Sequence, residues 1–191
     1  LAALDGQYFL LESVEGGNLG RYSFLGYHPK LSVSCKNGVV KVKENGMVRI
    51  LPGKPKEALQ SLLEQYRSPQ IEGLPTFTGG LVGYFAYETI QYAEPKLHIK
   101  QSDVNDFELM MFDKLLAFDQ VMHKLCIIVN ARTADGEAGY NKAVEEIDAF
   151  IETLRITEPI PYEKPQKAPE FTCNLSKEEY CSMVEKTKHY I

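Results

Sequence analysis

Three polar side chains near the amino terminus, Glu12, Ser13 and Arg21, have types and spacing that could do chemistry. Glu12 and Ser13 follow a short apolar run, residues 8–11, which is typical of a strand buried on both faces. A glycine-rich stretch, residues 15–20, predicts a hairpin that brings Arg21 back alongside them. A carboxylate at the edge of a dry region is costly unless a cation or a hydrogen-bond donor meets it.

Two interpretations of this trio stay open. In the first, Glu12 and Arg21 pair with each other and pin the hairpin, which is the commoner role of an ion pair. In the second, Glu12, Ser13 and Arg21 line a pocket. A carboxylate, a hydroxyl and a guanidinium could hold the ammonium and carboxylate groups of a free amino acid. Spacing alone does not decide between the two.

The elements that must position these residues are mostly strands. Short β-rich runs alternate with turns in the first third of the chain: YSFLGY, LSVSC, VVKVK and MVRIL. Two of the turns are Asn-Gly steps, which favour type I′ hairpins. Three later runs are also expected to be strands: FELMMF, KLLAFDQ and KLCIIVNA. The last two predict a hairpin at residues 121–123 and, being almost continuously apolar, a central place in a sheet.

Helical periodicity appears in three other segments. Residues 54–67 and 135–155 each keep one apolar stripe, as a helix packed on a sheet does. A third helix is opened by a capping box from Ser176 to Glu179. Strands and helices in this order predict an α+β fold, a mostly antiparallel β-sheet sandwich with outer helices.

The segment GGLVGYFAYE, residues 79–88, invites a phosphate-loop interpretation because it contains three glycines. The spacing is not GxGxxG and no Lys-Ser or Lys-Thr step follows, so a nucleotide site is not expected. Glycine inside an apolar strand more often marks a bulge or a close approach of two backbones. The aromatic residues of this segment are expected to add bulk to the core: Tyr84, Phe85 and Tyr87.

No metal site is expected from the remaining polar residues. Asp103 and Asp106 end a polar loop, and without further fixed ligands the default is a solvated loop. The four cysteines form no CxxC pair, which argues against zinc. Cys126 lies in an apolar run and is expected in the core. Unpaired thiols of this kind favour a reducing, cytoplasmic location.

The composition is that of an ordinary globular protein, with 44% hydrophobic and 25% charged residues. A formal net charge of −5 argues against nucleic acid or an anionic membrane surface as the main partner. No apolar stretch approaches the length of a membrane span, and the first residues lack the features of a signal peptide. The chain has no initiator methionine and stops inside its last helix, so we expect both ends to be truncated.

Several motifs in a fixed order resemble the N-terminal domain of anthranilate synthase component I. They are FLLESVEGG at 9–17, LGRYSFLGYHP at 19–29, GGLVGYFAYE at 79–88 and DKLLAFDQ at 113–120. The last, FTCNLSKEEYCSMVEKTKHYI at 171–191, is similar to the start of that family's chorismate-binding domain. The resemblance covers essentially the whole chain.

The resemblance implies an effector site and an activity. In this family the LLES segment forms part of the site where L-tryptophan binds and inhibits, which implies that role for Ser13 with Glu12 beside it. It also implies that the LGRY stretch lies against the same ligand: Leu19, Gly20, Arg21 and Tyr22. The family's Mg²⁺-dependent reaction adds ammonia to chorismate and eliminates pyruvate, and a separate glutamine amidotransferase subunit supplies the ammonia. Its catalytic residues and Mg²⁺ ligands belong to the C-terminal domain, so none is assigned here.

The resemblance also implies a division of the chain. Residues 1–157 correspond to the N-terminal regulatory domain, and residues 171–191 to the start of the chorismate-binding domain. The prolines of residues 158–170 independently predict a linker between them, and the pattern of FTCN predicts a short strand after it. The resemblance sharpens the fold to a layered sandwich in which both domains contribute strands. Two alternatives remain: aminodeoxychorismate synthase component I of the folate pathway, and a stand-alone amino-acid-binding module.

Overall fold

A computed structural model describes residues 6–12, 20–94, 96–97, 99–100, 102–155, 170 and 172–191. The chain divides into two compact units, Leu1–Glu158 and Pro159–Ile191. Apart from Glu170, the proline-rich stretch predicted as a linker at 158–170 lies outside the described residues.

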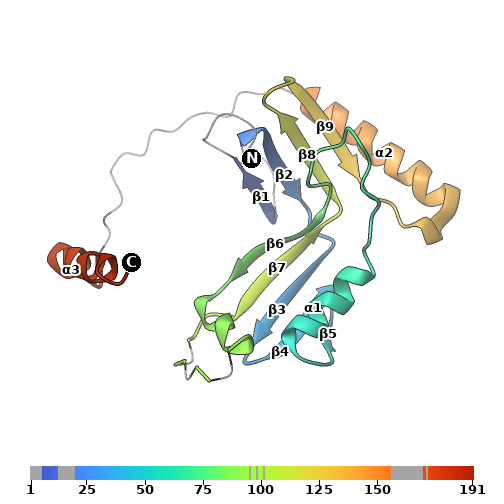
Figure 1. Cartoon of the computed structure of the whole chain (residues 1–191). Coiled ribbons are helices and arrows are strands. Elements are labelled where there is room, and N and C mark those ends of the chain that lie inside the picture. Colours follow the sequence, from blue (N-terminus) through green and yellow to red (C-terminus); the bar gives the residue numbers. More distant parts are fainter. Residues whose placement is uncertain are drawn as a thin grey trace. The chain divides into compact units, whose positions relative to one another are not determined.

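The first unit is built on two antiparallel sheets (Figure 1). The four-stranded sheet has the order β1-β2-β8-β9, made by Tyr8–Leu11, Tyr22–Tyr27, Lys114–Asp119 and Lys124–Val129. The five-stranded sheet has the order β5-β4-β3-β7-β6, made by Met47–Leu51, Val39–Glu44, Leu31–Lys36, Phe107–Phe112 and Gly80–Phe85. Two antiparallel sheets with helices outside them confirm the predicted α+β class.

The turns follow from local sequence. Asn37 and Gly38 have φ angles of 51° and 79°, and Asn45 and Gly46 have 50° and 79°. Positive φ at both central positions is the type I′ geometry that Asn-Gly favours. The first turn joins β3 to β4 and the second joins β4 to β5. His123, with φ of 49°, lies in the predicted turn between β8 and β9.

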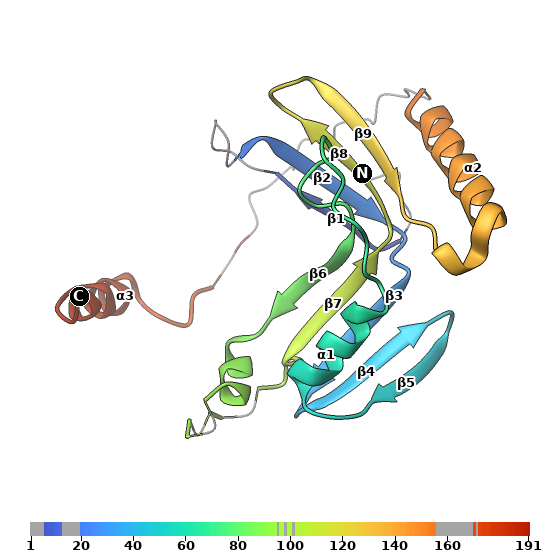
Figure 2. The same ribbon diagram turned by 45° about the vertical axis from the view of Figure 1, so that its right-hand side comes forward.

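The larger core lies between the five-stranded sheet and helix α1, Pro55–Glu64, which crosses the face of that sheet (Figure 2). Strand β3 alternates buried and half-exposed residues, and Val33 on its inner side is completely buried. Leu62 of α1 is also completely buried against this cluster. Removing a leucine side chain of this kind from water contributes about 1.5–3 kcal/mol.

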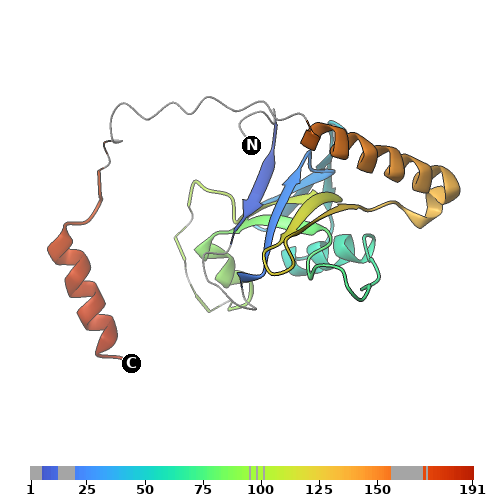
Figure 3. The ribbon, with the colours of Figure 1, turned by 90° about the horizontal axis from the view of Figure 1, so that it is seen from above.

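A smaller core belongs to the four-stranded sheet. It is formed by Leu115, Ala117 and Ile128, and half-buried Cys126 packs against it as the sequence predicts. Helix α2, Gly136–Arg155, contacts β9 at the edge of this sheet (Figure 3). The ring of Phe150 on α2 lies 4.7 Å from that of Tyr27 on β2.

Strand positions correct two predictions. Strand β1 is not buried on both faces, because it lies at the edge of its sheet; only Phe9 is buried, while its three other residues are exposed. Strand β9 is likewise at an edge and not central. An edge strand has a neighbour on one side only, so its apolar residues depend on cover from elsewhere. For β9, part of that cover comes from α2.

The aromatic residues at the end of β6 do not add bulk to the core, contrary to the prediction. Tyr84, Phe85 and Tyr87 are exposed to 41%, 59% and 80%. Strand β6 is the edge of the five-stranded sheet, and Tyr87 opens the short 3₁₀ helix η2, Tyr87–Tyr92. The prediction about glycine holds: a Cβ on Gly83 would lie 2.0 Å from the backbone oxygen of Glu108, so the two backbones approach closely there.

Asp106 corrects the prediction of a solvated loop. Its carboxylate is buried and accepts hydrogen bonds from the Tyr92 hydroxyl at 2.6 Å and from the Gly38 backbone amide at 3.3 Å. The thiol of Cys35 donates to the same oxygen at 3.5 Å. Asp103 is exposed, as expected. The burial of Asp106 could not be seen in sequence because its donors come from two distant segments, the β3–β4 hairpin and η2.

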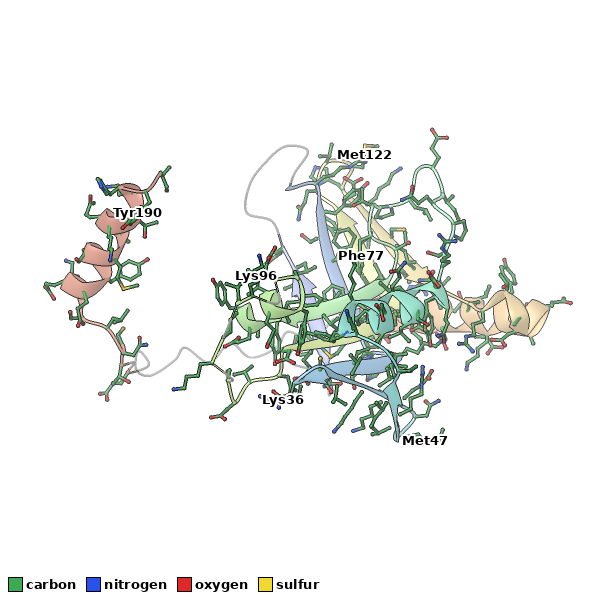
Figure 4. All side chains as sticks on the ribbon, turned by 60° about the horizontal axis from the view of Figure 1, so that its bottom comes forward. Lys36, Met47, Phe77, Lys96, Met122 and Tyr190 are labelled. Carbon is green, nitrogen blue, oxygen red and sulfur yellow. The ribbon has the colours of Figure 1, made fainter. Side chains whose placement is uncertain are left out.

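The second unit is described from residue 172, with Glu170 before it. Ser176 and Glu179 form the predicted capping box at the start of helix α3, Lys177–Lys188. The FTCN strand is not formed in its described residues, 172–174, where no neighbouring strand completes the hydrogen bonds of an extended segment. The apolar stripe of α3, including Tyr180 and Met183, is exposed, as is Tyr190 (Figure 4). None of the described helices could span a membrane.

Candidate functional site

The predicted hairpin places two of the candidate residues at its loop end, where the chain leaves β1 and enters β2. Strands β1 and β2 pair antiparallel, with Leu11 opposite Phe24. Glu12 follows the last residue of β1 and is exposed, whereas Arg21 directly precedes β2. Gly20 is buried. Two further candidates, Ser13 and Leu19, lie outside the described residues.

Arg21 pairs with Asp119 and not with Glu12, so the interpretation in which Glu12 and Arg21 form an ion pair is wrong. Its Nη2 lies 2.6 Å from Oδ2 of Asp119, and its Nε donates to both carboxylate oxygens at 3.1 and 3.0 Å. The reason is topological: β2 lies between β1 and β8, and Tyr22 is the register partner of Asp119. The Arg21 carbonyl also accepts from the Gln120 amide at 2.7 Å.

Asp119 is the fixed part of this contact. Its Oδ1 accepts the backbone amides of Val121 and Met122, both at 3.0 Å, in the turn that ends β8. Figure 4 shows Met122 at the tip of that turn. The hydrogen bonds from Arg21, with smaller contributions from the two amides, lower the pKa of Asp119 to about 2. The carboxylate is therefore charged at neutral pH and holds the guanidinium in one orientation.

An aromatic row continues from the ion pair into the core. The guanidinium carbon of Arg21 lies 5.0 Å from the ring centroid of Tyr22, which lies 5.8 Å from that of Phe24. Phe24 meets Phe77 edge to face at 5.6 Å. The Nη1 group of Arg21 takes no part in the contact with Asp119. A guanidinium beside an aromatic ring can receive the carboxylate of a molecule that also carries an apolar ring.

Comparison with known proteins shows the family. The family model described as chorismate binding enzyme matches residues 7–191. The chain belongs to the chorismate binding enzyme family. It is 34% identical over 195 residues to anthranilate synthase component 1 of Acetivibrio thermocellus, covering 96% of this chain and 40% of that relative. It is 35% identical to the protein of the same name from Acinetobacter calcoaceticus, covering 97% of this chain and 39% of the relative.

A solved structure shares the fold. Anthranilate synthase component I from Streptococcus pneumoniae TIGR4 matches with a TM-score of 0.67 at 23% identity. The match covers 100% of this chain and 42% of that one. The chain thus spans about 40% of the length of the curated relatives it matches.

Within this member of the chorismate binding enzyme family, three of the described candidate side chains are open to solvent: Glu12, Arg21 and Tyr22. Four surface cavities of about 380, 480, 560 and 900 Å³ are lined by other residues. Glu12 is exposed, and Arg21 and Tyr22 are half-exposed. In the described part of the chain, none of these four cavities therefore includes Glu12, Arg21 or Tyr22.

Asp119 is the residue that sequence reasoning did not assign to the site. A signal was present, because Asp119 ends the nearly continuous apolar run of β8, where a carboxylate needs a cationic partner. What the sequence did not show was that the partner lies in the LGRY stretch, 98 residues earlier.

The family resemblance implies Mg²⁺, and the described residues do not fit such a site. No group of three or more His, Cys, Asp or Glu side chains in the described ranges is placed to hold a metal ion. The Asp119 carboxylate beside the candidate site is already engaged by Arg21. No step of the chemistry is therefore assigned to these residues.

Proposed function

We propose that this chain is the N-terminal regulatory part of an anthranilate synthase component I. The complete enzyme would convert chorismate and ammonia to anthranilate and pyruvate in tryptophan biosynthesis, with Mg²⁺ bound outside the described residues. A glutamine amidotransferase subunit would supply the ammonia, in the cytoplasm. The observation that carries the proposal is the likeness to two proteins of that name along 96% and 97% of the chain.

The proposed regulatory role rests on the side chains of Arg21 and Tyr22. L-tryptophan carries a carboxylate and an aromatic ring, and the guanidinium of Arg21, whose Nη1 does not contact Asp119, lies beside the ring of Tyr22. Asp119 already fixes the orientation of that guanidinium, so little conformational entropy of the Arg21 side chain is lost when an anion binds. Glu12, Ser13, Leu19 and Gly20 complete the proposed effector site.

Inhibition through this site would be allosteric. An effector changes activity only by binding one arrangement of the enzyme more tightly than another. Since Glu12, Arg21 and Tyr22 are open to solvent, the other side of a tryptophan pocket would come from outside the described residues. We therefore expect tryptophan to bind the complete enzyme more tightly than this chain alone.

Titration calorimetry of the complete enzyme with L-tryptophan tests the site. Ser13→Ala and Arg21→Gln should each weaken binding by about tenfold, equivalent to about 1.4 kcal/mol. Arg49→Gln, which removes an exposed arginine on β5, is the matched control and should leave the affinity unchanged. Unchanged affinity in both site variants would remove the assignment.

Product analysis tests the reaction separately. With chorismate and ammonia the complete enzyme should release anthranilate. Aminodeoxychorismate would assign the protein to the folate-pathway relative instead.

A further inference from the structure

A cavity apart from the proposed effector site gathers positive charge. It has a volume of about 480 Å³ and is lined by the segment that follows α1, by the end of β7 and by the segment that leads into α2. We call it the Tyr66 cavity. Its charged lining residues are Lys30, Arg67, Arg132 and Asp113.

Two of the cations converge on one ring. Lys30 Nζ lies 6.0 Å and the guanidinium carbon of Arg132 lies 5.6 Å from the centroid of Tyr66. Lys30 also contacts Asp113 at 3.1 Å, so that cation already has a partner. The guanidinium groups of Arg67 and Arg132 donate no hydrogen bond to another described residue. The lining therefore carries three positive charges against one negative charge, in a chain whose net charge is −5.

A purely structural explanation accounts for part of this arrangement. The last carbonyls of α1 lie at this place, and one cation near a helix C-terminus gains about 0.3–1 kcal/mol. The faces of Tyr66 stabilise cations by a similar amount. Arg67 and Arg132 are exposed and donate to water, and neither effect requires two arginines at the same cavity, where like charges repel each other. An anion between them would remove that repulsion and use their donors.

We propose that the Tyr66 cavity binds a small oxyanion ligand, one that carries a phosphate or several carboxylates. Arg132 and Arg67 hold the oxyanion, and Lys30 adds charge from the far side while remaining paired with Asp113. The volume lies in the range of small-molecule sites, and Leu63 and Pro69 add apolar wall for the rest of the ligand.

Titrations with inorganic phosphate and with citrate test this proposal, each against sodium chloride at matched ionic strength. The readout is the backbone amide NMR signals of residues 131–134. Saturable shifts with either probe, and not with chloride, support the site; the tighter probe shows whether the ligand is a phosphate or a polycarboxylate. Arg132→Gln and Arg67→Gln should each weaken binding by about tenfold.

Arg49→Gln is the matched control, because it removes the same charge from an exposed position outside the cavity. It should leave the affinity unchanged, and circular dichroism should confirm that every variant folds. Shifts that grow without saturation, or that chloride reproduces, would mean screening alone and overturn the proposal. Equal weakening by Arg49→Gln would do the same. These variants leave the proposed effector site unchanged, so the test of tryptophan binding and the test of oxyanion binding can fail independently of each other.

Discussion

Arg21 and Asp119 are 98 residues apart in sequence, and their side chains meet at 2.6 Å where the start of β2 pairs with the end of β8. The contact joins the end of the LGRY stretch to the turn that closes β8. It fixes Arg21 without using its Nη1 group. The ion pair is thus both a link within the sheet and part of a surface that faces outward.

Replacing Asp119 should change how stability depends on pH. The folded-state pKa of about 2 lies below the ordinary 3.8, so the unfolded chain binds more protons between these values. The contribution of ionised Asp119 to folding stability is fully present above about pH 4 and is lost as the pH falls through about 2. Asp119→Asn should therefore lower stability at neutral pH and flatten this acid-dependent loss.

Urea unfolding at a series of pH values measures the effect. Asp103→Asn removes an exposed carboxylate and is the control, which should follow the parent curve. A parallel pH dependence in Asp119→Asn and the parent would contradict the role of the ion pair.

Removing the Tyr92 hydroxyl should destabilise the first unit. It donates to the buried Asp106 at 2.6 Å, and a hydrogen bond to a charged group contributes about 1.5–3 kcal/mol. Tyr92→Phe should lower the free energy of unfolding by that amount in chemical denaturation. Tyr87 is 80% exposed and serves as the control. Tyr87→Phe should change the free energy of unfolding by no more than about 0.5 kcal/mol. Equal effects of the two substitutions would argue against the Asp106 network.

The four thiols should react at different rates. Burial, followed by the hydrogen bond to Asp106, raises the pKa of Cys35 from 9.0 to about 11, which reduces its thiolate fraction about a hundredfold. Cys173 and Cys181 are exposed. With iodoacetamide at mildly alkaline pH, mass spectrometry should find these two labelled first and Cys35 last. The denatured chain serves as control, since there the four rates should converge; early labelling of Cys35 in the native chain would contradict its burial.

Adding a methyl group at Gly83 should disrupt the pairing of β6 with β7. The new Cβ would lie 2.0 Å from the Glu108 backbone oxygen, and a backbone atom cannot move aside as a side chain does. We expect Gly83→Ala to cost about 3 kcal/mol, at the upper end for overpacking. Gly46→Ala, at a positive φ with open space around it, should cost about 1 kcal/mol. Thermal unfolding compares them, and the reverse order would refute the close approach of the two backbones.

Features that depend on neighbours in sequence were predictable. The Asn-Gly turns follow from the φ angles those residues tolerate, and the Ser176 capping box joins groups three residues apart. The alternation of buried and half-exposed residues along β3 is set by the period of a strand. In each case the physical cause acts over a few residues, so the sequence contains it in full.

Which strand lies at an edge, and which charges meet, was decided by tertiary structure. The exposure of Phe85 follows from the outer position of β6, and the burial of Asp106 from donors in the β3–β4 hairpin and in η2. At the candidate site the sequence supplied Glu12 and Arg21, and the interpretation that paired them with each other is wrong. Sheet order placed β8 beside β2 and so gave Arg21 to Asp119, because an ion pair forms between the groups that packing brings together, whatever their separation along the chain.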